Sequence, residues 1–395
     1  MRPALVAFLA LAAVIDSSTA QQITPNLPKL GSSWTDVGYP KIYWTPANGA
    51  SFGLYYAQLR PPGFNDWDDA PPYRANISID GEISTSGSYR LGLEFKFPSF
   101  FPGWRFDLRF RTTRLARQNY FGIGNETAFD NNKVTDAQPY YYKMDRRRLF
   151  LRGTAQRQLF SRLRALAGFH LEGWQLDTLR GPSLLGEQTQ AGLGPPIGSR
   201  TWQVNLRLGL VFDSRDDEVT PRRGALIEAL FDGADSTIVG DVSYARFTAA
   251  AAAFQSVGER LTLGARVVGQ AMSGSPPVGT YFTIEASERA YHGLGGSSSH
   301  RGLATGRFLA QDKLFANLDA RFLLGGQRQV VTVDLLGFID VGRVFQPGDD
   351  FTLARLHVGA GLGPMITIGR NGIIGWTFAW GPDQLQVHTL TSWTF

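Results

Sequence analysis

Apolar and polar side chains alternate along many short stretches of this chain. In residues 88–97, every second residue from Tyr89 to Phe97 is aromatic or aliphatic, and the residues between them are polar, charged or glycine. Residues 104–111 repeat the pattern with an arginine or aspartate at each polar position. Further alternating runs lie at 77–83, 202–210, 314–322, 331–341 and 385–395. A period of two residues predicts β-strands that each have one apolar and one polar face.

A soluble β-sandwich and a membrane-spanning β-barrel both produce this alternation. The barrel is favoured by the strand at 104–111, where Arg105, Arg109 and Arg111 share one face and the other face is wholly aromatic or aliphatic. Such a strand is typical of an outer-membrane barrel, whose outward side chains meet lipid and whose lumen is polar. The 45 glycines and the aromatic content of 12% agree with this class. We therefore predict an all-β protein in the outer membrane of a Gram-negative bacterium.

The N-terminus has the features of a secretory signal peptide. A positive charge at Arg2 precedes the apolar run 4–15, and small residues at 18–20 offer a cleavage site. We predict a cleaved signal peptide over 1–20, with a buried N-terminal helix as the alternative. After it, no apolar run is long enough for a transmembrane helix.

Residues 21–48 contain four prolines and no clear periodicity. We interpret them as a short periplasmic segment that precedes a barrel at 49–395. The chain has no cysteine, which predicts neither a disulfide nor a thiolate metal site. The net charge of +5 is small, and the arginines of the chain are spread through the predicted strands, so we expect no nucleic-acid partner.

The number of strands follows from the parity of such barrels. The alternating runs give about fifteen strands, whereas bacterial single-chain barrels have an even number, with short periplasmic turns and longer outer loops. Counting back from Phe395 places the connection 272–311 outside as the sixth extracellular loop. A further strand is then needed near 118–127, where 120–124 is the candidate. We predict a sixteen-stranded antiparallel transmembrane barrel whose long sixth loop folds into the lumen.

That sixth loop contains the strongest candidate for a functional site. It includes Gly295-Gly296 and His300-Arg301-Gly302, and it is followed by a strand with an aspartate, Phe338-Ile339-Asp340. A surface loop rich in glycine and serine is one interpretation. The other is a buried latch, because a planar guanidinium can bridge a carboxylate with two hydrogen bonds. The strand count directs Phe338 and Asp340, and also Asp319 and Arg321, into the lumen.

Three motifs in this order resemble the outer-membrane assembly-factor superfamily, the group that contains BamA, TamA and the two-partner secretion transporters. They are the loop motif with its following strand (295–321), the strand motif 338–342, and the turn 213–224, which includes Asp213 and Arg215. The resemblance implies that Arg301 contacts Phe338 and Asp340. It departs from the family at His300 and Leu303. We interpret Trp393 and Phe395 as an aromatic C-terminal strand signal.

The resemblance also implies a function. Members assist the insertion or translocation of proteins, or of lipids, at the outer membrane, and usually carry periplasmic POTRA domains. This chain is similar to a short subclass that lacks them, so a separate periplasmic or lipoprotein partner is expected to replace them. Outer-membrane lipid and lipopolysaccharide are the expected surroundings.

Two other classes of function are weighed against this one. A passive channel that favours anions would use the lumenal arginines Arg90, Arg105, Arg109, Arg111, Arg148 and Arg152, unless these pair with Glu94, Asp107 and Glu172. An enzyme would need a nucleophile and a base that converge in space, and residues adjacent on one loop, such as Ser299 and His300, seldom do so. No histidine pair has metal-ligand spacing. We predict no enzymatic activity, no cofactor and no metal.

Overall fold

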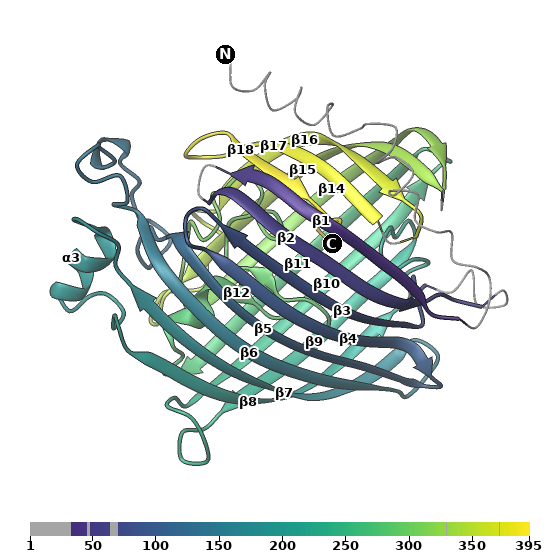
Figure 1. The fold of residues 1–395 in the computed structure, drawn as a ribbon, viewed down its shortest axis with the longest axis horizontal. Coiled ribbons are helices and arrows are strands. Elements are labelled where there is room, and N and C mark those ends of the chain that lie inside the picture. Colours follow the sequence, from purple (N-terminus) through teal and green to yellow (C-terminus); the bar gives the residue numbers. More distant parts are fainter. Residues whose placement is uncertain (1–32, 46–47, 64–69, 329, 371) are drawn as a thin grey trace.

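The described part of the chain is dominated by one antiparallel sheet of sixteen strands, in which neighbours follow chain order (Figure 1). The computed structural model describes residues 33–45, 48–63, 70–328, 330–370 and 372–395. The strands are β1 (Thr35–Thr45), β2 (Gly49–Arg60), β3 (Ala75–Ser84), β4 (Tyr89–Phe101), β5 (Trp104–Asn119), β6 (Lys143–Gln158), β7 (Leu163–Asp177), β8 (Arg200–Asp213), β9 (Gly224–Ala234), β10 (Tyr244–Val257), β11 (Leu261–Gly274), β14 (Asp312–Gln327), β15 (Val331–Phe345), β16 (His357–Ile368), β17 (Gly372–Trp380) and β18 (Gln386–Leu390). The prediction of an all-β, sixteen-stranded fold is confirmed.

The remaining elements are short and lie in the connections. They are η1 (Asn131–Lys133), α3 (Leu184–Gln190), η2 (Val278–Phe282), β12 (Thr283–Ile284) and β13 (Tyr291–His292). Strands β12 and β13 pair only with each other, inside the connection between β11 and β14. Within the described residues, no helix has the length and apolar character needed to cross a membrane.

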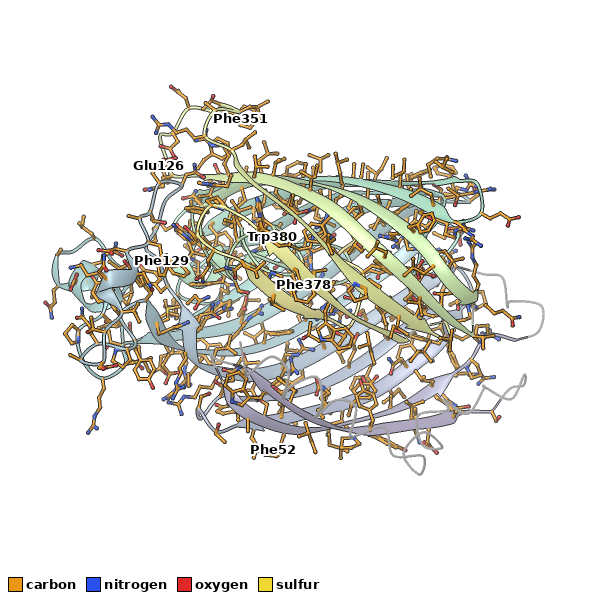
Figure 2. All side chains as sticks on the ribbon, turned by 90° about the horizontal axis from the view of Figure 1, so that it is seen from above. Phe52, Glu126, Phe129, Phe351, Phe378 and Trp380 are labelled. Carbon is orange, nitrogen blue, oxygen red and sulfur yellow. The ribbon has the colours of Figure 1, made fainter. Side chains whose placement is uncertain are left out.

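The wall is apolar outside and polar inside, as the alternation predicts. On β8, Leu206 and Leu208 are 69% and 61% exposed, whereas the neighbouring residues Asn205 and Arg207 are at most 1% exposed. Phe52 on β2 and Phe378 on β17 also lie on the outer surface (Figure 2). Because an apolar outer surface is stable in lipid but not in water, this pattern suits a transmembrane barrel.

The two ends of the barrel differ in the length of their connections. At one end, β10 and β11 are joined by residues 258–260 and β14 and β15 by residues 328–330, whereas at the other end β11 and β14 are joined by residues 275–311. Short turns mark the periplasmic end and long loops the outer end. The long sixth loop is therefore at the predicted end.

The predicted position of the additional strand is wrong. Residues 120–125 form no barrel strand, because Gly122 and Gly124 have φ values of 90° and 129° that interrupt an extended backbone. The additional strand is β1, which pairs with β2 over its full length. Its residues fell within the segment 21–48 that we interpreted as lying before the barrel. Pro40 obscured the pattern there, and a proline is tolerated because β1 is an edge strand. The barrel thus starts at Thr35, not Gly49; residues 1–32, including the predicted signal peptide, lie outside the described residues.

The C-terminus also departs from expectation. The alternating run 385–395 predicts a strand up to Phe395, but β18 ends at Leu390. Trp393 is 8% exposed and packs with Leu336 and Phe338, whose side chains face the lumen. Trp393 and Phe395 therefore do not extend the last strand, and their interpretation as a C-terminal strand signal stays a prediction.

Candidate functional site

The connection between β11 and β14, residues 275–311, is termed the lumenal loop, because it folds back inside the ring of strands (Figure 1). Leu294, Leu303 and Phe308 of this loop are at most 2% exposed and pack against Phe315 of β14 and Val344 of β15. The loop therefore forms a hydrophobic core with the inner wall. Leu303, which departs from the family pattern, belongs to that core.

The turn at the tip of the lumenal loop depends on two glycines. Gly295 and Gly296 have φ values of 115° and 109°, which favour glycine. A Cβ atom on Gly295 would lie 2.2 Å from the carbonyl oxygen of Ala304. Ser299 completes the turn, since its Oγ donates to the carbonyl of Gly293 and accepts from the amide of Gly295. The tip is therefore held in one shape before its side chains meet the wall.

The structure brings Arg301 together with Asp340 and Phe338. The Nε and Nη2 atoms of Arg301 donate to Asp340 Oδ2 and Oδ1 at 2.9 and 2.6 Å, and the backbone amide of Arg301 donates to Oδ2 at 2.7 Å. The guanidinium lies over the Phe338 ring, 3.7 Å from its centroid. This is the set of partners that the resemblance implied.

Asp319 is a direct partner as well, although sequence reasoning placed it only nearby. Arg301 Nη2 donates to Asp319 Oδ1 at 2.7 Å, so one guanidinium faces two carboxylates, and all three side chains are fully buried. Burial by itself lowers the pKa of Arg301, but Asp319 and Asp340 outweigh it and raise the pKa above its usual value. The side chain is therefore charged, as a buried ion pair requires.

Other contacts at this site were missed by sequence reasoning. Asn317 Nδ2 donates to Asp340 Oδ1 at 2.7 Å and to the carbonyl of Ser299 at 2.6 Å. Arg301 Nη1 donates to Thr394 Oγ1 at 3.3 Å, and Nε2 of His388 lies 2.8 Å from the Arg301 carbonyl oxygen. Two residues near the C-terminus thus complete the site. No local pattern marks Thr394 or His388 as its members.

Gly302 lets the tip approach the wall at backbone distance. A Cβ atom on Gly302 would lie 2.8 Å from the Cα of Gly359 on β16 and 2.9 Å from the carbonyl oxygen of Trp380. Glycine at both 302 and 359 leaves the room that Arg301 needs to reach Asp340.

Arg321 of β14 does not join the Arg301 site through a close ion pair. Its Nη2 lies 3.8 Å from Asp319 Oδ2 and donates to the carbonyl of Phe395 at 2.9 Å. Its guanidinium lies 4.2 Å from the centroid of the Trp393 ring. Arg321 therefore holds the C-terminal segment inside the lumen, which explains why Trp393 and Phe395 leave the wall.

Residues 120–125, predicted as a strand, instead cover the outer end of the lumenal loop. The amide of Gly124 donates to the carbonyl of Leu309 at 2.7 Å, and Asn125 Oδ1 accepts from the amide of Val344 at 3.0 Å. Arg307 of the loop pairs with Asp383 and lies 4.2 Å from the centroid of the Phe308 ring. The loop is therefore fixed at its outer end as well as at its tip.

The turn between β8 and β9 is fixed by its own charges. Arg215 Nε and Nη2 donate to Asp213 Oδ1 and Oδ2 at 3.0 and 2.9 Å, and Arg164 Nη2 lies 3.2 Å from the same carboxylate. Glu218 of this turn pairs with Arg105 at 2.5 Å. Asp213 and Arg215 are thus a separate cluster at the periplasmic end, not part of the Arg301 site.

The lumenal arginines are mostly neutralised. Five of the six that the channel alternative needs lie within ion-pair distance of a carboxylate: Arg90 with Glu82, Arg105 with Glu218, Arg109 with Asp107, Arg148 with Glu172, and Arg152 with Glu285. The lumenal loop also occupies the interior. A passive anion channel requires an open cationic wall, and this arrangement does not favour it.

Ser299 and His300 of the loop tip do not form a catalytic pair in this arrangement. The Oγ of Ser299 bonds to backbone groups, and Nε2 of His300 lies 3.0 Å from the carbonyl oxygen of His357. Among the described residues, no cluster of three or more histidines or carboxylates could hold a metal ion.

Comparison with known proteins identifies a matching family. Residues 74–380 match the Omp85 superfamily domain. Among solved structures, BamA from Haemophilus ducreyi lacking POTRA domains 1–3 is similar at 11% identity with a TM-score of 0.54, over 96% of this chain and 78% of that one. CdiB from Escherichia coli is similar at 12% identity with a TM-score of 0.57, over 90% of this chain and 61% of that one. At such identity the likeness concerns the fold alone. No curated protein sequence matches the chain.

Proposed function

Because this chain belongs to the Omp85 superfamily, we propose that it assists the insertion or translocation of polypeptides at the bacterial outer membrane. The fold supports this proposal by its similarity to BamA and CdiB. The surroundings would be outer-membrane lipid and lipopolysaccharide. A separate periplasmic or lipoprotein partner would deliver the substrate.

The observation that carries the proposal is the pair of edges at which the sheet begins and ends. Strands β1 and β18 are its first and last members, and within the described residues no ladder joins one to the other. β18 has only 5 residues in the sheet, whereas β1 has 11. An unpaired edge offers free amide and carbonyl groups to an incoming strand. A client polypeptide would add to this edge.

The lumenal loop would act as the internal brace of this barrel. Arg301 would be a latch that joins the loop to β14 through Asp319 and to β15 through Asp340. Both strands are distant from the β1 edge in the order of the sheet. A latch at that position would keep one half of the wall rigid while a client strand adds at the edges.

The proposal is tested with purified protein in liposomes. An unfolded β-barrel client is added and its folding is followed by gel mobility and protease protection. We expect folding several-fold faster than in protein-free liposomes. Cysteines introduced into β1 and β18 and joined by oxidation should abolish the gain, because the link holds the two edges together and blocks an incoming strand.

The control is a cysteine pair that leaves the edges free. Ile42 of β1 and Phe52 of β2 face each other in their ladder, so the double variant Ile42→Cys/Phe52→Cys joins strands that are already paired. The chain has no cysteine of its own to interfere. If the β1–β18 link and the control link leave folding equally fast, the client does not enter at the edges and the proposal fails.

A further inference from the structure

A short acidic segment of the lumenal loop, residues 285–288, is bound by basic side chains of the inner wall. Glu285 is 1% exposed and lies at the centre of three arginines from β6, β8 and β10. Its carboxylate is 3.2 Å from Arg152 Nη1, 3.3 Å from Arg207 Nη1 and 3.5 Å from Arg246 Nη2. Sequence reasoning did not identify Glu285, which follows no motif.

Glu288 repeats the arrangement three residues further on. Its carboxylate lies 3.2 Å from Arg105 Nη2 on β5 and 3.6 Å from Lys96 Nζ on β4. The two glutamates therefore reach different parts of the wall. The segment therefore contacts the part of the inner wall that runs from β4 to β10.

The wall contacts the backbone of this segment as well as its carboxylates. Arg152 Nη2 donates to the carbonyls of Ala286 and Ser287 at 2.5 and 3.1 Å, and Arg207 Nη2 donates to the carbonyl of Ala286 at 3.2 Å. Glu228 of β9 accepts from the amide of Ser287 at 3.2 Å and also from its hydroxyl. Contacts to main-chain groups do not depend on side-chain identity, so the wall presents a site for a peptide segment with acidic positions.

The five wall cations Lys96, Arg105, Arg152, Arg207 and Arg246 are termed the basic cradle. Within the described residues, Glu285 is the only carboxylate paired with Arg152, and Glu288 is the only one paired with Lys96. Arg207 and Arg246 also share Asp232, and Arg105 also has Glu218. If the loop left the lumen, Arg152 and Lys96 would lose their counter-charges, which is costly for buried groups.

We infer that the basic cradle is a binding site for an acidic polypeptide segment with carboxylates three residues apart, and that residues 285–288 occupy it as an internal substitute. The inference deepens the proposed function and rests on it. A polypeptide in transit would replace the loop segment in the cradle, and its carboxylates would take over the ion pairs of Glu285 and Glu288. The exchange leaves no wall cation without a partner.

The experiment measures single-channel currents of the full chain in planar bilayers. The double variant Glu285→Gln/Glu288→Gln weakens the hold of the wall on the loop, so we expect at least about tenfold more time in open states than in the wild type. The peptide Thr-Ile-Glu-Ala-Ser-Glu-Arg, which copies residues 283–289, should then block these openings. A peptide with glutamine at both acidic positions should need an at least ~10-fold higher concentration.

Matched variants separate the site from general charge effects. Asp136→Asn/Asp350→Asn removes two exposed carboxylates from outer loops and should leave the currents unchanged. Arg152→Gln in the double-variant background should abolish the preference for the acidic peptide, because Arg152 contacts both the carboxylate and the backbone. If the double variant does not fold, the single variant Glu288→Gln replaces it, since the Glu288 side chain is 27% exposed and less confined.

Two outcomes would overturn the inference. One is equal block by the acidic and the glutamine peptides, and the other is acidic block that survives Arg152→Gln. The client-folding assay in liposomes is independent of these currents. A failure of client folding with peptide block intact removes the proposed function and keeps the peptide site, whereas the reverse pattern removes only the site.

Discussion

Replacement of Arg301 by alanine should destabilise the barrel more than any other single change in the lumenal loop. The substitution removes three hydrogen bonds from the guanidinium to carboxylates and one to Thr394. It also leaves Asp340 buried without its cation and Asp319 with only Arg321, at 3.8 Å, and both carboxylate side chains are 0% exposed. Removing one partner from a buried ion pair typically costs ~3–5 kcal/mol of the free energy of unfolding. Because two buried carboxylates lose their closest cation here, we expect a cost at the upper end of that range.

Asp340→Asn should cost less, about 2–3 kcal/mol, because Arg301 keeps Asp319 and the asparagine keeps one acceptor oxygen. In the double variant Arg301 and the charge of Asp340 are removed together, so no unpaired carboxylate remains at position 340. Its cost should therefore be close to that of Arg301→Ala alone. The resulting coupling energy between the two residues is ~2–3 kcal/mol, the range for residues in direct contact.

The measurement is urea-induced unfolding of the four proteins of this cycle in the same liposomes, followed by tryptophan fluorescence. The control cycle replaces Asp340→Asn by Asp334→Asn, on the same strand, where Thr332 donates to the carboxylate and no contact with Arg301 exists among the described residues. That control should be additive within ~0.5 kcal/mol. Additive costs for Arg301 and Asp340 would refute the reasoning, because residues whose side chains share two hydrogen bonds cannot act independently.

Two further predictions concern the packing of the loop tip and of the C-terminus. Gly302→Val should lower the free energy of unfolding by ~1–3 kcal/mol, because its Cβ would lie 2.8 Å from Gly359 Cα. Gly337→Ala should change the free energy of unfolding little, because a Cβ there would meet nothing within 4 Å. Both are measured by urea unfolding, and equal effects would contradict the close approach of Gly302 to the wall. Trp393→Ala should lower the free energy of unfolding by ~3–5 kcal/mol, because the side chain fills the lumenal cluster with Leu336 and Phe338. Trp44→Ala should lower it much less in detergent, because Trp44 is 68% exposed on the outer surface. A small effect at Trp393 would place that ring outside the core.

The faces of the strands could be predicted from sequence because their signal is local. Alternation within a single strand decides which side chains face lipid, and Leu206 and Arg207 lie on the predicted sides. Parity then supplied the total of sixteen, but not the identity of the missing strand. The pairing of β1 with β2 is visible only as a ladder, since Pro40 interrupts the local pattern. Gly122 and Gly124, in contrast, looked like strand residues until their φ values were known.

The site could be predicted only where a known motif covers it. Arg301 and Asp340 were paired through the family resemblance, not through spacing in the chain. Asp319, on the predicted lumenal face of β14, proved to be a second partner of the same guanidinium. Glu285 and Arg152 lie 133 positions apart and share no motif, so their contact depends on how the loop lies within the sheet of sixteen strands. Long-range contacts of this kind need the fold before they can be recognised.

Two of the anchors of the lumenal loop, its tip and the segment 285–288, use opposite charges, and this has a consequence for its movement. At the tip the loop supplies a cation to two carboxylates of the wall, and in the segment 285–288 it supplies two carboxylates to the basic cradle. Because these groups are largely buried, salt in the solvent screens them little. Neither anchor can be released by ionic strength alone. Withdrawal of the loop requires groups that replace its charges, and a polypeptide that carries both acidic and basic residues could supply them in the order in which it enters. The loop is therefore better understood as a bound polypeptide than as an inert plug.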